Sequence, residues 1–142
     1  NVVSIFAGII KGLGFSYGSE THIISRLAKT IGDVLVSEYG ASPATFSFGS
    51  QSWGNDLWMS CTGNTRNREF GILLGRGLSA QKARQTMAMQ HKTIEGINTV
   101  KIMGRLNLIN DIPELALLHQ LIVEKNISID NLKKHLLTNT VN

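Results

Sequence analysis

Cysteine is almost absent from this sequence, because Cys61 is the only one among 142 residues. A single thiol excludes an internal disulfide framework and leaves no cluster of thiolates for a structural zinc ion. No apolar run approaches the roughly 20 residues that are needed to cross a bilayer, and the start Asn1-Val2-Val3 lacks the order of a signal peptide. We therefore expect a soluble, cytoplasmic protein without a membrane span.

Histidine is scarce as well, and its four positions offer no metal site. His22, His91, His119 and His135 never fall into H-E-x-x-H or another close ligand spacing. Each is better explained as a surface or packing histidine. We expect no bound metal.

The charge is moderately basic, with a formal net charge of +4 and a pI near 9.5. This balance favours anionic partners, which include nucleic acid, a membrane surface and a small phosphorylated substrate. The basic residues are spread along the chain, so no stripe for a nucleic acid or a membrane is visible. A local anion site is the simpler expectation.

Long alternations of apolar and polar residues, which would indicate β-strands, are also missing. The apolar residues recur instead at helical spacing, and the length suits one domain with its own core. We predict a single irregular multi-helix domain, all-α, over residues 1–142. We expect a first helix over residues 2–10 and a central helix over residues 19–40, with Ser19 as its cap and Gly40 as its stop. A short helix should start at Ser42-Pro43, another at Ser79, and a further one should cover residues 94–102. The last two should start at the capping box of Asp111 and Glu114 and at Ser128.

A glycine-rich segment, Gly12-Leu13-Gly14, superficially resembles a dinucleotide-binding loop. It follows a helical pattern, and its glycine spacing does not match G-x-G-x-x-G. We interpret it as a tight connection between helices, where glycine supplies a positive φ.

The richest polar segment runs from residue 53 to residue 68. Asn64 or Thr65 can cap the helix that follows, which would expose first-turn amides beside Arg66. The planar guanidinium could bind two phosphate oxygens, while Ser60 and Asn67 would add neutral hydrogen bonds. From spacing alone, a solvated and capped helix start is the better explanation of the segment.

Two further residues of this segment have ordinary structural explanations. Asp56 is either a partly buried carboxylate in need of a cation or another helix cap. Cys61 is interpreted as an inert, buried thiol, because no neighbouring histidine or CxxC pattern would activate it.

Taken in order, several short motifs resemble one known family across most of the chain. They are Asn1-Val2-Val3, Gly12-Leu13-Gly14, Asp33, Asp56-Leu57, Ser60-Cys61, Arg66-Asn67-Arg68 and Glu95-Gly96. This series is similar to the C-terminal, substrate-binding domain of NAD(P)-dependent glycerol-3-phosphate dehydrogenase, whose fold is shared with 6-phosphogluconate dehydrogenase-like enzymes. The combined pattern is far more specific than any single motif.

The resemblance implies reversible reduction of dihydroxyacetone phosphate to sn-glycerol 3-phosphate, and with it a role in carbohydrate metabolism and phospholipid biosynthesis. In the family, NAD or NADP is held mainly by an N-terminal Rossmann domain, and a lysine directly before the position of Asn1 is the general acid or base. By resemblance, Asn1 and Asp56 help organise that lysine and the substrate oxygen. Ser60, Arg66 and Asn67 would hold the phosphate, and Arg66 and Glu95 lie on the cofactor side.

The sequence departs from the family in two places. It reads Trp53-Gly54-Asn55 where the family usually has Gly-x-Gly, and Ser60 where the family has threonine. Ser60 keeps the hydroxyl, whereas Trp53 and Asn55 reduce backbone freedom before Asp56.

Neither the Rossmann domain nor the lysine is within these 142 residues, so we expect the isolated chain to be an inactive fragment of the enzyme. The family also implies a homodimer surface. The alternative hypothesis is a non-enzymatic anion-binding or interaction module that reuses the helical fold.

Overall fold

The computed structural model describes residues 1–139, and within this range it contains helices and loops but no strand. The all-α prediction is confirmed. The α-helices are α1 (Val2–Gly12), α2 (Tyr17–Tyr39), α3 (Asp56–Thr62), α4 (Arg66–Gly75), α5 (Ala80–Met89), α6 (Glu95–Arg105), α7 (Pro113–His119) and α8 (Ile129–Asn139). A 3₁₀ turn (Pro43–Phe46) and a π-helical turn (Gln51–Asn55) connect α2 to α3, and a second π-helical turn (Gln120–Glu124) follows α7.

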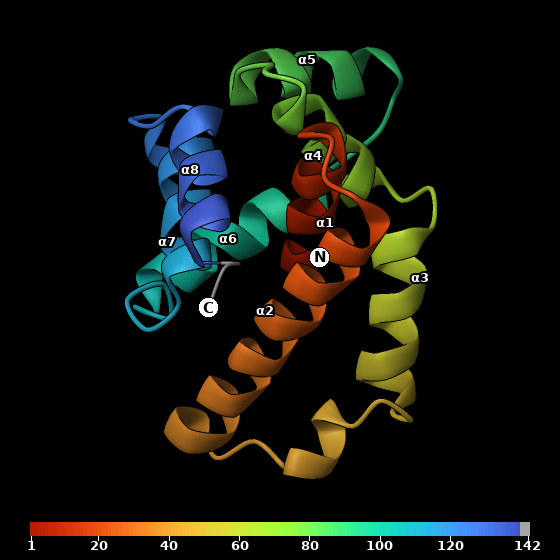
Figure 1. Ribbon diagram of the computed structural model, residues 1–142, viewed down its shortest axis with the longest axis vertical. Coiled ribbons are helices and arrows are strands. Elements are labelled where there is room, and N and C mark those ends of the chain that lie inside the picture. The colour runs from red at the N-terminus through yellow and green to blue at the C-terminus, as the bar shows by residue number, and fades with distance from the viewer. Residues whose placement is uncertain (140–142) are drawn as a thin grey trace.

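Helix α1 is the centre of the core, and the other helices surround it (Figure 1). Every residue from Val2 to Ile10 is buried. The reason is that α1 has no charged side chain before Lys11, and a helix that is apolar on all sides must be covered on all sides. The helix predicted over residues 19–40 does form, as α2, but the prediction that it is the central helix is wrong. Although α2 is longer than α1, its last seven residues contain no buried position.

Glycines allow α1 and α4 to pack with their backbones in contact. A Cβ atom at Gly8 would lie 2.0 Å from the carbonyl oxygen of Arg68, and one at Gly75 would lie 2.3 Å from that of Ile9. Only residues without a side chain fit such a crossing. The contacts advance in the same direction along both helices, so α1 and α4 run parallel and their N-terminal ends lie side by side.

The helix boundaries confirm some of the predicted caps and correct others. Gly40 ends α2 in the left-handed conformation, with φ +67°. Ser16 rather than Ser19 caps α2, since its hydroxyl accepts the amide of Ser19 at 3.2 Å. The capping box at Asp111 does not form, because α7 begins at Pro113, whose fixed φ suits the first helical position.

The segment that connects α2 to α3, residues 40–55, lies at one end of the molecule (Figure 1). We call it the apolar arm, after its phenylalanine and tryptophan side chains. Phe46 and Trp53 meet edge to face, with ring centroids 4.9 Å apart. Beside them, a cavity of about 640 Å³ lies between α2 and α3, and none of the predicted site residues lines it. Phe48, Trp58 and Met59 are exposed in the same region.

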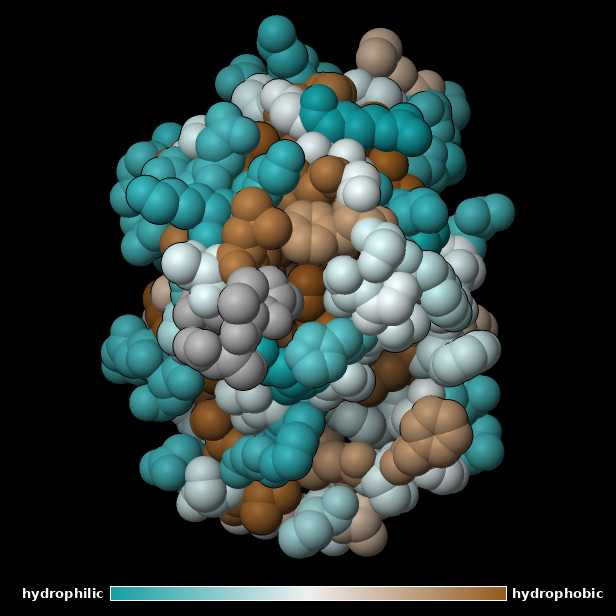
Figure 2. Space-filling view, in the orientation of Figure 1, coloured by the Kyte–Doolittle hydropathy of each residue, from teal (hydrophilic) through white to brown (hydrophobic). Residues whose placement is uncertain are grey.

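The surface is mostly hydrophilic, but hydrophobic residues remain visible between the polar ones on the face shown in Figure 2. Among residues 1–139, no helix combines the length and the apolar character that a membrane span requires.

Candidate functional site

The N-terminal ends of α1, α4 and α6 meet at the side chain of Asn67. Its amide nitrogen donates to the side-chain oxygen of Asn1 at 2.8 Å, and its oxygen accepts the backbone N–H of Gly96 at 3.0 Å. Asn67 is buried, whereas Asn1 is exposed at the edge of the site. Helix N-termini carry free amides and partial positive charge, so three of them together favour an anion.

Arg66 adds a full positive charge at the same place. Its guanidinium forms an ion pair with Glu95 at 2.8 Å, and both side chains are about half exposed, at 51% and 48%. Such a pair contributes about 0–1 kcal/mol, because water screens it. The guanidinium has five N–H donors, so this single contact orients Arg66 and leaves donors for a ligand.

Ser60 and Asp56 lie one helical turn apart on α3. The hydroxyl of Ser60 donates to the Asp56 carboxylate at a long 3.5 Å, and the carboxylate is exposed. Asp56 is the first residue of α3, where a negative charge is favourable to the helix dipole. The structure therefore connects Asp56 to the rest of the site only through Ser60 among the contacts of the described residues.

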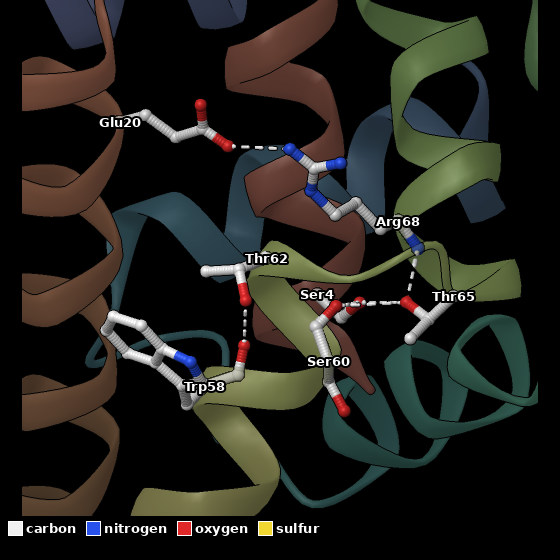
Figure 3. A network of polar contacts seen from close by, with 7 residues as sticks. All are labelled: Ser4, Glu20, Trp58, Ser60, Thr62, Thr65 and Arg68. Carbon is white, nitrogen blue, oxygen red and sulfur yellow. Dashed lines mark hydrogen bonds and ion pairs between the residues drawn. The ribbon is translucent and has the colours of Figure 1, made fainter.

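The backbone of Ser60 is tied firmly to the other two segments of the site (Figure 3). Its carbonyl oxygen accepts the hydroxyl of Ser4 at 2.6 Å and that of Thr65 at 2.9 Å. Thr65 also caps α4 by accepting the amide of Arg68, as the sequence predicted. Sequence reasoning missed Ser4, although a single hydroxyl inside an otherwise apolar helix was a usable signal.

A buried ion pair joins α2 to α4 beside this network (Figure 3). Arg68 contacts Glu20 at 3.1 Å, and the two side chains are 14% and 4% exposed. The Nε atom of Arg68 is buried without a hydrogen-bond partner within the described residues. Sequence reasoning missed this pair, because Glu20 in the first turn of a helix looks like an ordinary surface residue.

Cys61 senses both of these charges and is itself only 3% exposed. Burial raises the pKa of the Cys61 thiol to about 11, although the positive charge of Arg68 acts in the opposite direction. The thiol is therefore neutral at physiological pH, which confirms the interpretation as an inert, buried cysteine.

Trp53-Gly54-Asn55, where the sequence departs from the family, lies in the apolar arm. Trp53 packs on Phe46, and a Cβ atom at Gly54 would lie 1.8 Å from the carbonyl oxygen of Phe48. Gly54 therefore stands at the variable middle position of the family's Gly-x-Gly, and the packing leaves no room for a side chain there. No group of three or more metal-ligating side chains occurs in the described part of the chain.

Comparison with known proteins gives one family. Residues 1–133 match the family pattern described as NAD-dependent glycerol-3-phosphate dehydrogenase C-terminus. No solved structure matches significantly.

Curated relatives agree with this family. Proteins named glycerol-3-phosphate dehydrogenase [NAD(P)+] are 37% identical over 107 residues in Baumannia cicadellinicola subsp. Homalodisca coagulata and 40% identical over 102 residues in Glaesserella parasuis serovar 5. The same named protein of Escherichia coli (strain K12 / DH10B) is 38% identical over 108 residues. These matches cover 75%, 71% and 75% of this chain, but only 30%, 29% and 30% of the relatives.

Proposed function

This chain belongs to the NAD-dependent glycerol-3-phosphate dehydrogenase family, as its C-terminal domain, and we propose that it is the substrate-binding part of a longer enzyme. The proposed reaction is the reversible reduction of dihydroxyacetone phosphate to sn-glycerol 3-phosphate with NADH or NADPH. The relatives' name supports this proposal, and the chain spans about 30% of their length.

The phosphate is proposed to bind where α1, α4 and α6 meet. Arg66 supplies the charge and two parallel donors, while Asn67 and the Ser60 hydroxyl supply neutral hydrogen bonds. The contact of Arg66 with Glu95 is weak enough for a phosphate dianion to compete with it. Because the surrounding amides are fixed in helices, little reorganisation accompanies binding.

The reacting oxygen of the substrate is proposed to lie nearer Asn1 and Asp56. Asn1 is held in place by Asn67, so its amide can orient a neighbouring polar group. The exposed carboxylate of Asp56 can hold a cationic group, such as the lysine that precedes this position in the family. In this proposal, both residues orient the proton donor rather than carry the proton.

The cofactor is proposed to be NAD or NADP, which supplies the hydride when bound. The described residues form no parallel sheet with a glycine-rich turn and so do not fit a whole dinucleotide. Only Arg66 and Glu95 are proposed to reach it from this domain.

The observation that carries the proposal is the convergence of three helix N-termini beside Arg66. The test is a titration of the chain with glycerol 3-phosphate, followed by the amide NMR shifts of Arg66, Asn67 and Gly96. We expect these amides to shift with glycerol 3-phosphate and to stay unchanged with glycerol. Equal shifts with both compounds, or none at these amides, would contradict the phosphate assignment and favour a different use of the fold.

We also propose a homodimer in the cytoplasm. The free, buried thiol of Cys61 supports a reducing compartment. The exposed side chains of Phe48 in the apolar arm and of Trp58 and Met59 in α3 support an interface at this end of the molecule. Light scattering of the full-length enzyme and of its Phe48→Ser variant tests the dimer, since the variant should dissociate more readily.

A further inference from the structure

We propose that Ser4 and Thr65 are positioning residues for the phosphate, because their hydroxyls bind the Ser60 carbonyl. These bonds fix the start of α1, the end of α3 and the start of α4 relative to one another. The inference rests on the proposed function, since it concerns the same phosphate site. It assigns a role to two side chains that would not themselves touch the substrate.

The carbonyl of Ser60 needs such partners. It lies in the last turn of α3, which ends at Thr62, and the last carbonyls of a helix lose their backbone donors. Two hydroxyls take their place, that of Ser4 at 2.6 Å and that of Thr65 at 2.9 Å. Ser4 is 1% exposed, so water has little access to replace its hydroxyl.

Each hydroxyl comes from a different segment of the candidate site. Ser4 lies in the first turn of α1, three residues after Asn1, and Thr65 directly precedes Arg66 and Asn67. The two hydroxyl oxygens are 3.1 Å apart, so α1, the end of α3 and the start of α4 meet within a few ångströms (Figure 3). Without either hydroxyl, we expect the end of α3 to be held less firmly against the start of α4, so that the position of Ser60 relative to Arg66 changes.

Thr65 has a second function that ties the network to the phosphate. Its oxygen accepts the amide of Arg68 and so caps α4 at the turn that presents Arg66. Arg68 is also the partner of the buried Glu20, which holds that turn against α2. The hydroxyls of Ser4 and Thr65 therefore connect the packing of α1, α3 and α4 to Arg66, the proposed anchor of the phosphate.

The experiment compares Ser4→Ala and Thr65→Val with two controls in the full-length enzyme. Thr65→Ser keeps the hydroxyl, and Ser79→Ala removes the corresponding cap of the distant helix α5. The readouts are KM for dihydroxyacetone phosphate, kcat/KM for unphosphorylated dihydroxyacetone, and the unfolding temperature.

We expect Ser4→Ala and Thr65→Val to raise KM for dihydroxyacetone phosphate about tenfold, with a much smaller effect on dihydroxyacetone. Thr65→Ser should behave like the wild type, and Ser79→Ala should lower the unfolding temperature without changing either substrate's kinetics. If Thr65→Val does not fold, Ser4→Ala decides alone, because it leaves the α4 cap intact.

Unchanged phosphate selectivity in folded Ser4→Ala, or the same kinetic change in Ser79→Ala, would overturn the positioning role. A wild-type enzyme that does not favour the phosphorylated substrate would instead contradict the proposed function. The two failures are therefore distinguishable.

Discussion

Arg66 is the residue on which the phosphate proposal depends most directly. It is half exposed, it pairs with Glu95 through one nitrogen, and it lies at the first position of α4. Lysine keeps the charge but not the planar fork of donors. We predict that Arg66→Lys in the full-length enzyme weakens binding of dihydroxyacetone phosphate by roughly 1.5–3 kcal/mol, with KM for the cofactor nearly unchanged.

Steady-state kinetics with dihydroxyacetone phosphate and with dihydroxyacetone measure this effect. Selective loss for the phosphorylated substrate would support the assignment. An equal loss for both substrates would mean that Arg66 stabilises the fold and does not hold the phosphate.

Cys61 predicts a specific dependence of stability on pH. Burial raises the pKa of its thiol from 9.0 to about 11. Below pH 9 the thiol is protonated in both the folded and the unfolded chain. Between pH 9 and pH 11 the unfolded chain loses this proton more readily than the folded chain. Stability should therefore fall as the pH rises through this window, by about 2–3 kcal/mol from this group.

Denaturant unfolding from pH 8 to pH 11 tests the prediction, with Cys61→Ala as the reference. The difference between the two proteins isolates the contribution of the thiol. Parallel curves would show that the thiol reaches solvent in the folded state.

At the scale of single residues, the sequence predicted the polar segment from residue 53 to residue 68 and a cap at Asn64 or Thr65, of which Thr65 forms the cap. It did not predict the ion pair of Glu20 with Arg68, because the two residues are 48 positions apart. A pairing of this kind is decided by tertiary packing, which no local spacing encodes. The roles of all the predicted site residues stay predictions: Asn1, Asp56, Ser60, Arg66, Asn67 and Glu95.

Among the helices, the parallel crossing of α1 and α4 determines where the site lies. We predict that Gly8→Ala lowers the free energy of unfolding by about 2–4 kcal/mol, because the new methyl group would meet the Arg68 carbonyl and separate the helices. This loss exceeds the roughly 1 kcal/mol by which alanine favours a helix over glycine. Urea unfolding measures the change.

Gly18 provides a matched control in α2. A Cβ atom at this position meets nothing within 4 Å, so Gly18→Ala should leave stability unchanged or raise it by up to about 1 kcal/mol. Similar losses in the two variants would contradict the close-packing explanation.

The order of the helices was largely predictable from apolar spacing and capping residues, as at Gly40, Thr65 and Ser79. The identity of the central helix was not. Length favoured residues 19–40, whereas the absence of charge before Lys11 was the better guide, because burial on every side requires an apolar surface on every side. The start of α7 was misplaced since Pro113 outweighed the side chain of Asp111.

Considered as a whole, the molecule carries the proposed phosphate site but no dinucleotide-binding sheet within residues 1–139. We predict that a polypeptide of residues 1–142 alone does not oxidise NADH or NADPH with dihydroxyacetone phosphate. Addition of the nucleotide-binding domain of the family, with its lysine, should produce the activity. The measurement is the absorbance of the reduced cofactor at about 340 nm. Turnover by the polypeptide alone would contradict the proposal that it contains only the substrate-binding part of the active site.

The meeting of α1, α4 and α6 at Asn67 has a thermodynamic consequence. A ligand at that point is recognised by three helices together, so only the folded chain can bind it. By mass action, a phosphorylated metabolite at about 100 times its dissociation constant adds about 2.7 kcal/mol to the folded state. The lifetime of the protein in the cell would then follow the supply of its own substrate.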